Sequence, residues 1–406
     1  MHSVVSIAKG NINGTQTSYT AQDVLDTKRL LEKCLNNLGG LDVLMGKVES
    51  VMIKPNLVEV PYPTTEGSVL TDPRLLEALV MLLKEYGVPK VYVGEGRSVN
   101  LKHIASGARD AFYKSGLGQA VERAGGIIVG WDEEPFVPVE IPDGQLFKSV
   151  NVPKSILDAD YFINVPKLKM HCQTEITVAI KSMQGVYSTE DKVKFHNEAF
   201  PWKMVDMLRA VKPDLNIVDG IICGEGYGPI YTSPVDMGCI VASTDPVATD
   251  AVCSKMMDVE PVEVPITRVA WAEGMGEMDL DKIEIRGEKI EDVAKHFRRS
   301  EIWNPIGYHK HIKIFAGCAC RFTLCQIGAA VKRLELDGDF DRLHQDVCII
   351  VGCMAPVPVQ DYKNVIICGD DATDHPYYKE GRGTFIPGNP PLPSVQIVET
   401  LRQYLD

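Results

Sequence analysis

Cysteine is the residue type in this chain that points most directly to chemistry. Six of the eleven cysteines fall between Cys318 and Cys368. Three short apolar runs lead to Cys318, Cys353 and Cys368, and each has a glycine beside the cysteine. A short apolar run closed by glycine is typical of a buried strand. If the three strands are parallel in one sheet, these cysteines lie at its carboxyl edge, where open α/β sheets place their ligands.

The predicted metal ligands are Cys318, Cys320, Cys325, Cys353 and Cys368. The spacing Cys-x-Cys-x4-Cys, followed by two distant cysteines, is not one of the common zinc-finger or ferredoxin spacings. Soft thiolates select iron–sulfur clusters, zinc or Cu(I). We therefore expect a [4Fe–4S] cluster held by four of these residues, with Cys325 as the spare ligand and zinc as the alternative metal. A simpler interpretation is that Cys353 and Cys368 are small buried core residues.

A second group of polar residues stands near the ends of predicted strands in the longer N-terminal part. The predicted substrate ligands are Lys54, Asn56, Lys169, Lys181, Asp219 and Asp245. If those strands are parallel, side chains at their ends arrive at one edge of the sheet, where a doubly wound fold binds its ligand. Lysine ammonium groups are compact point charges that suit a carboxylate or a phosphate. The sequence therefore predicts a cationic floor for a small anionic substrate.

The predicted catalytic residues are His171, Lys167 and Glu225. We expect His171 to act in proton transfer, because the unperturbed pKa of histidine lies near neutrality. Asp219 and Asp245 could instead hold a hard cation such as Mg2+, although Asp245 stands before Pro246 and is more simply a helix N-cap. The glycines from Gly224 to Gly228 lack the G-x-G-x-x-G spacing, so they predict a mobile turn rather than a dinucleotide site.

Strands and helices in alternation are needed to bring these residues together. We expect strands over residues 48–57, 90–93, 161–165, 215–218 and 239–242. Asp72 before Pro73 predicts the start of a helix that ends at Gly87. A second helix, from about Glu175 to Met183, is expected to carry Lys181. This alternation predicts a mainly parallel sheet covered by helices on both faces.

Length and composition favour two domains. We expect a large, mainly parallel α/β domain over residues 1–297, a linker over 298–310, and a smaller α/β domain over 311–406 with the clustered cysteines. A chain of 406 residues, 45% of them hydrophobic, is long enough to bury two cores. The net charge of -13 argues against nucleic acid or an anionic membrane as the main partner.

The expected compartment is the cytoplasm. No apolar run approaches the roughly 18–20 residues that span a bilayer. The first residues lack the basic region and long apolar stretch of a signal peptide. In a reducing cytoplasm the cysteines are expected to be free thiols, metal ligands or redox centres rather than disulfides.

Four segments in order resemble a known family. They are Met52-Ile-Lys-Pro-Asn-Leu57, Thr71-Asp-Pro73, Asn164-Val-Pro-Lys-Leu-Lys169 and Ser243-Thr-Asp-Pro-Val247. Together they resemble domain of unknown function 362, a large prokaryotic family whose members are often described as iron–sulfur proteins. The resemblance covers residues from about Val51 to Lys255 and implies an α/β domain but no reaction. Its motif residues in this chain are Lys54, Asn56, Asp72, Lys167, Lys169 and Asp245.

Many members of that family carry a fused ferredoxin module with closely spaced Cys-x2-Cys runs, and this sequence has none. The predicted function is an iron–sulfur enzyme, an oxidoreductase or lyase, whose cluster passes electrons or acts as a Lewis acid on a small anionic substrate. One alternative is a non-catalytic iron–sulfur protein for redox, electron transfer or metal delivery. Another is a hydrolase or transferase with structural zinc and Mg2+.

The partner predictions follow from the same residues. We expect a small anionic substrate, a redox partner protein, and a second copy of the chain in a homo-oligomer. Nucleic acid and membrane are not expected as partners, because the net charge is -13 and no long apolar run is present.

Overall fold

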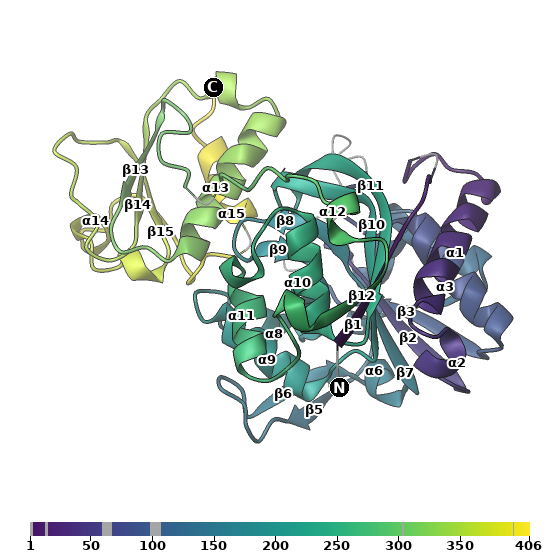
Figure 1. Cartoon of the computed structure of the whole chain (residues 1–406). Helices are drawn as coiled ribbons and strands as arrows, with labels where there is room; N and C mark the ends of the chain where they lie inside the picture. The colour runs from purple at the N-terminus through teal and green to yellow at the C-terminus, as the bar shows by residue number, and fades with distance from the viewer. Residues whose placement is uncertain (1–2, 13–14, 59–66, 98–106, 303, 393) are drawn as a thin grey trace. The chain divides into compact units, whose positions relative to one another are not determined.

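The computed structural model describes residues 3–12, 15–58, 67–97, 107–302, 304–392 and 394–406. The chain divides into two compact units, one made of Met1–Lys192 with Pro201–Arg299 and the other of Val193–Phe200 with Ser300–Asp406. Both are α/β (Figure 1), so the predicted fold class is confirmed: a large, mainly parallel sheet is followed in the chain by a smaller sheet domain.

The large sheet has the strand order β12-β1-β11-β10-β7-β2-β3-β4. In addition, β8 pairs with β10, and β9 pairs with β8. The strands are β1 Ser3–Lys9, β2 Ser50–Pro55, β3 Lys90–Glu95, β4 Ile127–Gly130, β7 Tyr161–Val165, β8 Lys167–His171, β9 Glu175–Thr177, β10 Leu215–Tyr227, β11 Tyr231–Ser243 and β12 Ile283–Gly287. A separate ribbon pairs β5 Phe136–Glu140 with β6 Ser149–Pro153.

The run from β10 through β7, β2 and β3 to β4 is parallel. Every residue of β2 and β7 is buried, which is the pattern of strands covered on both faces. On the other side of the sheet, β10 pairs antiparallel with β11, and β11 pairs antiparallel with β1. The carboxyl ends of β2, β3 and β7 therefore meet at one edge, as the sequence predicts.

The prediction of a mobile turn over Gly224 to Gly228 is wrong for most of its length. β10 and β11 are each 13 residues long and pair as far as Tyr227 and Tyr231. A Cβ at Gly224 would lie 2.7 Å from the Ser68 carbonyl oxygen, so this glycine is required for close approach inside the sheet rather than for a turn.

The helices of the larger unit cover both faces of its sheet. They are α1 Ala21–Asn36, α2 Leu41–Leu44, α3 Pro73–Tyr86, α4 Ala108–Lys114, α5 Leu117–Arg123, α6 Lys154–Asp158, α7 Ala179–Ser182, α8 Thr189–Val193, α9 Phe200–Ala210, α10 Pro246–Met256, α11 Pro265–Ala272 and α12 Ile290–Val293. Leucines of α1 and α3 share one core with β2, β3 and β7. Figure 1 shows α1 and α3 on one face of this sheet and α10 on the other.

Helix α3 begins and ends where the sequence predicts. The Asp72 side chain caps its N-terminus by accepting a hydrogen bond from the main-chain N–H of Arg74, and Pro73 occupies the first turn. Gly87 ends the helix in the left-handed conformation, with φ 101°. This cap fixes the start of α3 beside the carboxyl edge of the sheet.

The predicted helix from Glu175 to Met183 is only partly correct. Residues Glu175–Thr177 form β9, and the helix α7 spans Ala179–Ser182. The β-branched Ile176 and Thr177 favour extended structure, and β9 is paired with β8. Lys181 nevertheless lies in a helix, as predicted.

A buried carboxylate of α10 holds α7 in place. Asp250 accepts hydrogen bonds from the main-chain N–H groups of Ala179 (2.7 Å) and Ile180 (3.3 Å). Burial raises the pKa of Asp250 to about 8, although these hydrogen bonds oppose the shift. The Thr267 hydroxyl faces the same carboxyl and also opposes the rise of its pKa.

The smaller unit contains a parallel four-stranded sheet in the order β13-β14-β15-β16. Its elements are β13 Ile312–Ala316, α13 Arg321–Leu336, β14 Val347–Val351, β15 Asn364–Cys368, α14 Pro376–Lys379, β16 Thr384–Ile386 and α15 Val395–Arg402. The three predicted strands of this region and their parallel arrangement are confirmed. Helices α13 and α15 share a core with one face of this sheet.

Hydropathy gives one further fact about the helices. Within the described part of the chain, none is both long and apolar enough to cross a membrane.

The raised pKa of Asp250 predicts a pH-dependent effect of Asp250→Asn. A carboxyl whose folded-state pKa is about 8, against an ordinary value of 3.8, stabilises the fold at acid pH and loses that contribution as the pH rises to 8. The variant cannot titrate, so its stability relative to the wild type should increase by on the order of 1 kcal/mol or more between pH 5 and pH 8.

Urea unfolding of both proteins at several pH values measures this difference. The groups that face the carboxyl are the Ala179 and Ile180 N–H groups, Thr267 and Asp245. A stability difference that does not change with pH would contradict the assignment of a neutral Asp250.

Candidate functional site

Five lysines of the larger unit form one continuous group, called here the lysine cluster: Lys54, Lys167, Lys169, Lys181 and Lys192. Their ammonium groups are close enough to influence one another, because Lys169 is affected by Lys167 and Lys181, and Lys181 is affected by Lys54 and Lys192. Lys54 lies near the end of β2, two members lie in β8, and the last two lie in the short helices α7 and α8. Four of the five are residues that the sequence analysis singles out.

The first buried ion pair of the cluster joins β2 to β3. Lys54 Nζ lies 2.6 Å from Glu95 Oε2, and both side chains are almost fully buried. Lys54 Nζ also donates to the Ser182 hydroxyl at 3.3 Å, which connects β2 to α7. This pair fixes an ammonium at the carboxyl edge of the sheet.

The second buried ion pair joins β8 to β10. Lys167 Nζ donates to Asp219 Oδ2 at 2.9 Å, and neither side chain is exposed. The same carboxylate accepts hydrogen bonds from the main-chain N–H groups of Asp72 (2.6 Å) and Ile221 (3.0 Å). Burial raises the pKa of Asp219, while the Lys167 ammonium opposes the shift. Asp219 and Lys167 therefore support the site from within the fold.

The other three lysines, Lys169, Lys181 and Lys192, have lowered pKa values, so their protonated forms are less stable than in water. Lys169 Nζ donates to the carbonyl oxygens of Val69 (2.8 Å) and Pro229 (2.9 Å), and burial together with nearby Lys181 and Lys167 lowers its pKa well below the ordinary value. Burial, followed by the charge of Lys54, lowers the pKa of Lys181 to about 8. Burial also lowers the pKa of Lys192 to about 8, against the opposing effect of Glu95.

Carboxylates also act on this cluster. Among the described residues they include Glu95 beside Lys54, Asp219 beside Lys167 and, for Lys192, Asp132. The neighbouring carboxylate of Asp72 is matched by Arg74, at 2.6 Å. An anion placed here would be stabilised by several ammonium groups in a region of low dielectric.

Two of the other predicted residues lie close to the cluster. Asn56 Nδ2 donates to the Val69 carbonyl oxygen at 2.7 Å, the same oxygen that Lys169 contacts. His171 ends β8, and its Nδ1 accepts a hydrogen bond from the Gln173 N–H at 3.0 Å. That hydrogen bond places the proton of neutral His171 on Nε2.

The contacts of Asp245 and Glu225 lie elsewhere in the larger unit. Asp245 caps α10 by accepting hydrogen bonds from Val247 N–H and Ala248 N–H, which is the simpler role that its position before a proline predicts. Glu225 Oε2 accepts a hydrogen bond from the Arg298 main-chain N–H at 2.9 Å. Neither contact reaches a lysine of the cluster.

Lys192 is the member that sequence reasoning missed. It belongs to α8, a helix of five residues in a polar segment, and no strand end announces it. The burial of Lys192 comes from tertiary contacts. Lys192 Nζ donates to the Arg97 carbonyl oxygen at 2.8 Å, and Lys203 Nζ donates to the main-chain carbonyl oxygen of Lys192 at 3.0 Å. Only a buried position distinguishes it from an ordinary surface lysine.

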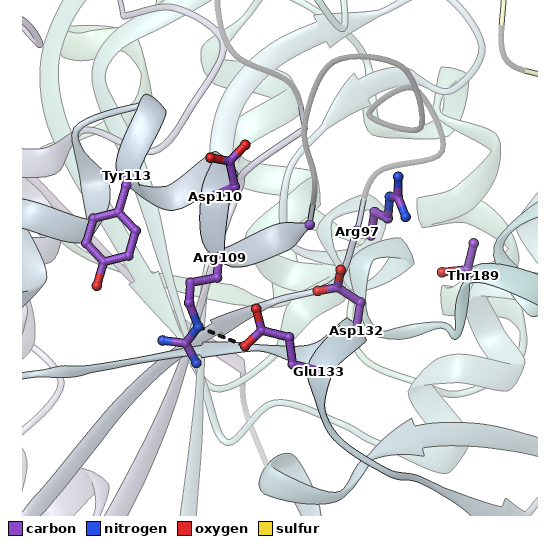
Figure 2. Close-up of a pocket in the computed structure, with 8 residues that line it drawn as sticks. Arg97, Arg109, Asp110, Tyr113, Asp132, Glu133 and Thr189 are labelled. Atoms are coloured by element: carbon purple, nitrogen blue, oxygen red, sulfur yellow. Dashed lines mark hydrogen bonds and ion pairs between the residues drawn. The ribbon is translucent and has the colours of Figure 1, made fainter.

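A cavity of about 760 Å³ lies beside Lys192. Figure 2 shows the residues that line it: Arg97, Gly107, Arg109, Asp110, Tyr113, Asp132, Glu133 and Thr189. Asp132 raises the pKa of Lys192, which links the cavity to the cluster. The Arg109–Glu133 ion pair, at 2.8 Å, is largely exposed. The cavity therefore offers both charge signs at the border of the lysine cluster.

The five predicted cysteine ligands have different surroundings. Cys318 is exposed, and Cys320 and Cys353 are half-buried, whereas Cys325 and Cys368 are buried. Cys318 and Cys353 face each other across an isolated bridge, with Cys318 N–H donating to the Cys353 carbonyl oxygen at 2.8 Å. Cys368 belongs to the apolar core under α13 and α15.

The structure brings two of the five cysteines, Cys318 and Cys353, directly together. Among the described residues, no three Cys, His, Asp or Glu side chains are grouped so that they could hold a metal ion. Cys320 is directed to Glu198, with its Sγ 3.9 Å from Glu198 Oε1. The [4Fe–4S] cluster and the zinc alternative remain predictions from the sequence, and no reaction step is assigned to them.

Comparison with known proteins gives a family and one relative of substantial coverage. A family model described as Domain of unknown function (DUF362) matches residues 51–255. A thylakoid-associated protein of Synechocystis sp. is 27% identical over 297 residues, which are 72% of this chain and 88% of that protein. The matched family segment runs from β2 to α10 and contains the whole lysine cluster.

Two solved structures show weaker similarity. A protein from Thermotoga maritima has 14% identity and a TM-score of 0.35, with 62% of this chain and 60% of that chain covered. The lactate racemase apoprotein from Thermoanaerobacterium thermosaccharolyticum has 16% identity and a TM-score of 0.38, with 63% of this chain and 57% of that chain covered. The chain thus spans less than two thirds of either structure.

The buried Lys167–Asp219 pair predicts a large effect of Lys167→Met. Removing one partner of a buried ion pair leaves an uncompensated charge and typically costs about 3–5 kcal/mol. We expect urea unfolding at pH 7 to show a loss of this order. The double variant Lys167→Met with Asp219→Asn should recover part of it, because the isolated carboxylate is then removed.

The matched control is Lys154→Met, which breaks an exposed i,i+4 pair with Asp158. Such pairs contribute about 0.3–0.5 kcal/mol. Equal effects of the Lys167 and Lys154 substitutions would contradict a fold-supporting role of the buried pair.

Proposed function

This chain belongs to the family of domain of unknown function 362, and we propose that it is an enzyme acting on a small carboxylate or phosphate anion bound at the lysine cluster. One observation carries the proposal: the ammonium groups of Lys169 and Lys192 are buried, and among the described residues neither forms an ion pair with a carboxylate. Burying unmatched ammonium groups is costly, and strongly perturbed pKa values of this kind gather at functional sites.

The bound anion would complete the charge balance. Lys54 and Lys167 are already held by carboxylates, so they position the site. Lys169 and Lys192 donate to main-chain carbonyl oxygens, and since neither is paired with a carboxylate of the described residues, a ligand could neutralise their charges. Ammonium groups from β8 and α8 approach from different elements, and this suits a carboxylate or phosphate that presents several oxygens.

Lys181 is the residue that we propose for proton transfer. Its pKa of about 8 leaves a substantial neutral fraction near neutral pH, so its amine can accept a proton from a substrate. Cys172 is close enough to raise the pKa of Lys181, and it directly follows His171 in the chain. With its proton on Nε2, neutral His171 can serve as the matching donor.

A redox role of the cysteines is the second candidate function. The proximity of Cys318 and Cys353 favours it, because two thiols side by side can exchange electrons as a dithiol–disulfide couple. It concerns the smaller unit alone, and the proposal for the lysine cluster does not depend on it.

Anion binding should depend on Lys181 and on pH. We expect inorganic phosphate or malonate to bind at pH 7, and Lys181→Met to weaken the stronger binder at least tenfold. Affinity should fall as the pH rises from 7 to 9, since Lys181 and Lys192 lose protons near pH 8 and an anion prefers their charged forms. Isothermal titration calorimetry in two buffers of different ionisation enthalpy also measures the proton uptake.

The control is Lys148→Met, which removes an exposed lysine outside the cluster. Thermal unfolding checks that the Lys181→Met variant stays folded. We expect it to do so, because the substitution removes a poorly solvated charge. Binding that is insensitive both to Lys181→Met and to pH would place the anion elsewhere.

Turnover has its own test. Lys181 would accept the proton from the carbon next to the carboxylate of the bound substrate. In D2O the hydrogen on that carbon should therefore exchange with solvent, and its proton NMR signal should decrease. A panel of small 2-hydroxy and 2-oxo carboxylates provides the probes, with Lys181→Met as the inactive variant. Binding without exchange for every probe would reduce the proposal to a binding protein.

A further inference from the structure

We propose that Cys318 and Cys353 form a redox-active dithiol that closes reversibly to an intramolecular disulfide. The two residues follow β13 and β14, which are neighbouring parallel strands with Ala316 opposite Val351. Each cysteine stands two positions beyond this last paired row, so the chain leaves the sheet at the same level on both strands.

The backbones then approach each other more closely than the sheet requires. Cys318 and Cys353 form an antiparallel bridge, with Cys318 N–H donating to the Cys353 carbonyl oxygen at 2.8 Å. A Cβ at Gly317 would lie 2.0 Å from that same oxygen. At Gly352 a Cβ would lie 2.5 Å from the Ala319 nitrogen. Only glycine permits contacts this short, so Gly317 and Gly352 allow the two backbone segments to come together.

The thiols themselves are neighbours. The Cys353 thiol donates to the Cys318 main-chain carbonyl oxygen at 3.7 Å. Cys318 raises the pKa of Cys353, after the larger effect of burial. Residues directly opposite in an antiparallel pair have Cβ atoms about 4.5–5.5 Å apart. A disulfide needs about 3.5–4.5 Å. A shift of about 1 Å in one of two loops outside the sheet therefore closes the bond.

Accessibility separates this pair from the buried thiols of the unit, and Cys320 is half-buried like Cys353. Cys318 is exposed and Cys353 is half-buried, whereas Cys325, Cys348 and Cys368 are buried. The residue after Cys353 is unusual: Met354 has φ 58° and is 79% exposed. A non-glycine residue in the left-handed region is strained, and such strain concentrates at functional segments. Asp374 holds this conformation by accepting a hydrogen bond from the Met354 N–H at 3.0 Å.

The oxidant is a low-molecular-weight disulfide. The Cys318 thiolate attacks one sulfur of that disulfide, which breaks its S–S bond, releases one thiol and leaves a mixed disulfide on Cys318. The Cys353 thiolate then attacks the Cys318 sulfur, forms the intramolecular bond and releases the second thiol. Two protein thiols are oxidised, one small disulfide is reduced to two thiols, and the two protons pass to the released thiols.

The two cysteines are expected to act in this order. Cys318 is the more exposed thiol, so it meets the small disulfide first. Cys353 is half-buried, so it acts second, on the mixed disulfide that its neighbour already carries.

The test treats the full-length protein with oxidised glutathione and then counts free thiols after denaturation. We expect a loss of two thiols, restored by dithiothreitol, and a tryptic species in which the peptides of Cys318 and Cys353 are joined. In Cys353→Ser, the internal bond should be absent and Cys318 should retain one glutathione. Cys320→Ser is the matched control and should still lose two thiols on oxidation.

Three results would overturn the proposal. One is an unchanged thiol count in the wild type. Another is an oxidised pair that includes Cys320 instead of Cys318 or Cys353. The third is near-equal iron and sulfide in protein purified without oxygen, lost in Cys318→Ser, because these sulfurs would then be cluster ligands. Anion binding at the lysine cluster is measured separately, so neither proposal's failure imitates the other's.

Discussion

The buried carboxylate of Asp219 is the point on which the larger unit depends. It accepts hydrogen bonds from the Lys167 ammonium of β8 and from the Asp72 N–H at the start of α3. It also lies where β10 changes partners: Leu215 and Asn216 pair with β7, whereas Asp219 pairs with β8. The Asp219 carboxylate thus connects β10, at the point where this strand changes partners, to β8 and to the start of α3. It can do so at zero exposure only because an ammonium compensates it.

The need to compensate buried charge explains why two lysines of the site are paired with carboxylates. The Lys167–Asp219 and Lys54–Glu95 pairs are nearly neutral as units, and they fix two strand ends at the carboxyl edge. Lys169 and Lys192 donate to carbonyl oxygens, and within the part of the chain that the structure describes neither is paired with a carboxylate. A fold selected for stability alone would place apolar side chains at these buried positions. The cost of burying Lys169 and Lys192 is the reason we propose that a ligand occupies the site.

The sequence predicts the sheet well wherever burial is continuous. β2 and β7 are buried along their whole length, and their uninterrupted apolar runs identify them without tertiary information. The glycines of β10 lead to a wrong prediction of a turn, because Gly224 is needed for the close approach of the Ser68 carbonyl oxygen and not for a turn. Lys192 could not be found, since its burial depends on Arg97 and Lys203, which are distant in sequence. Local patterns fail where a residue's role is decided by a long-range contact.

The cysteines show how one position in register changes the chemistry. In the first two apolar runs the glycine precedes the cysteine, so Cys318 and Cys353 lie beyond the last paired row of the sheet. In the third run the cysteine precedes the glycine, and Cys368 pairs directly with Val351 as the last residue of β15. It therefore occupies the same row as Ala316 and Val351 and packs in the same apolar core. Convergence at a strand edge requires equal register as well as parallel strands, and only two of the three runs meet that condition. The pairing of Cys318 and Cys353 is the geometry from which we propose dithiol chemistry.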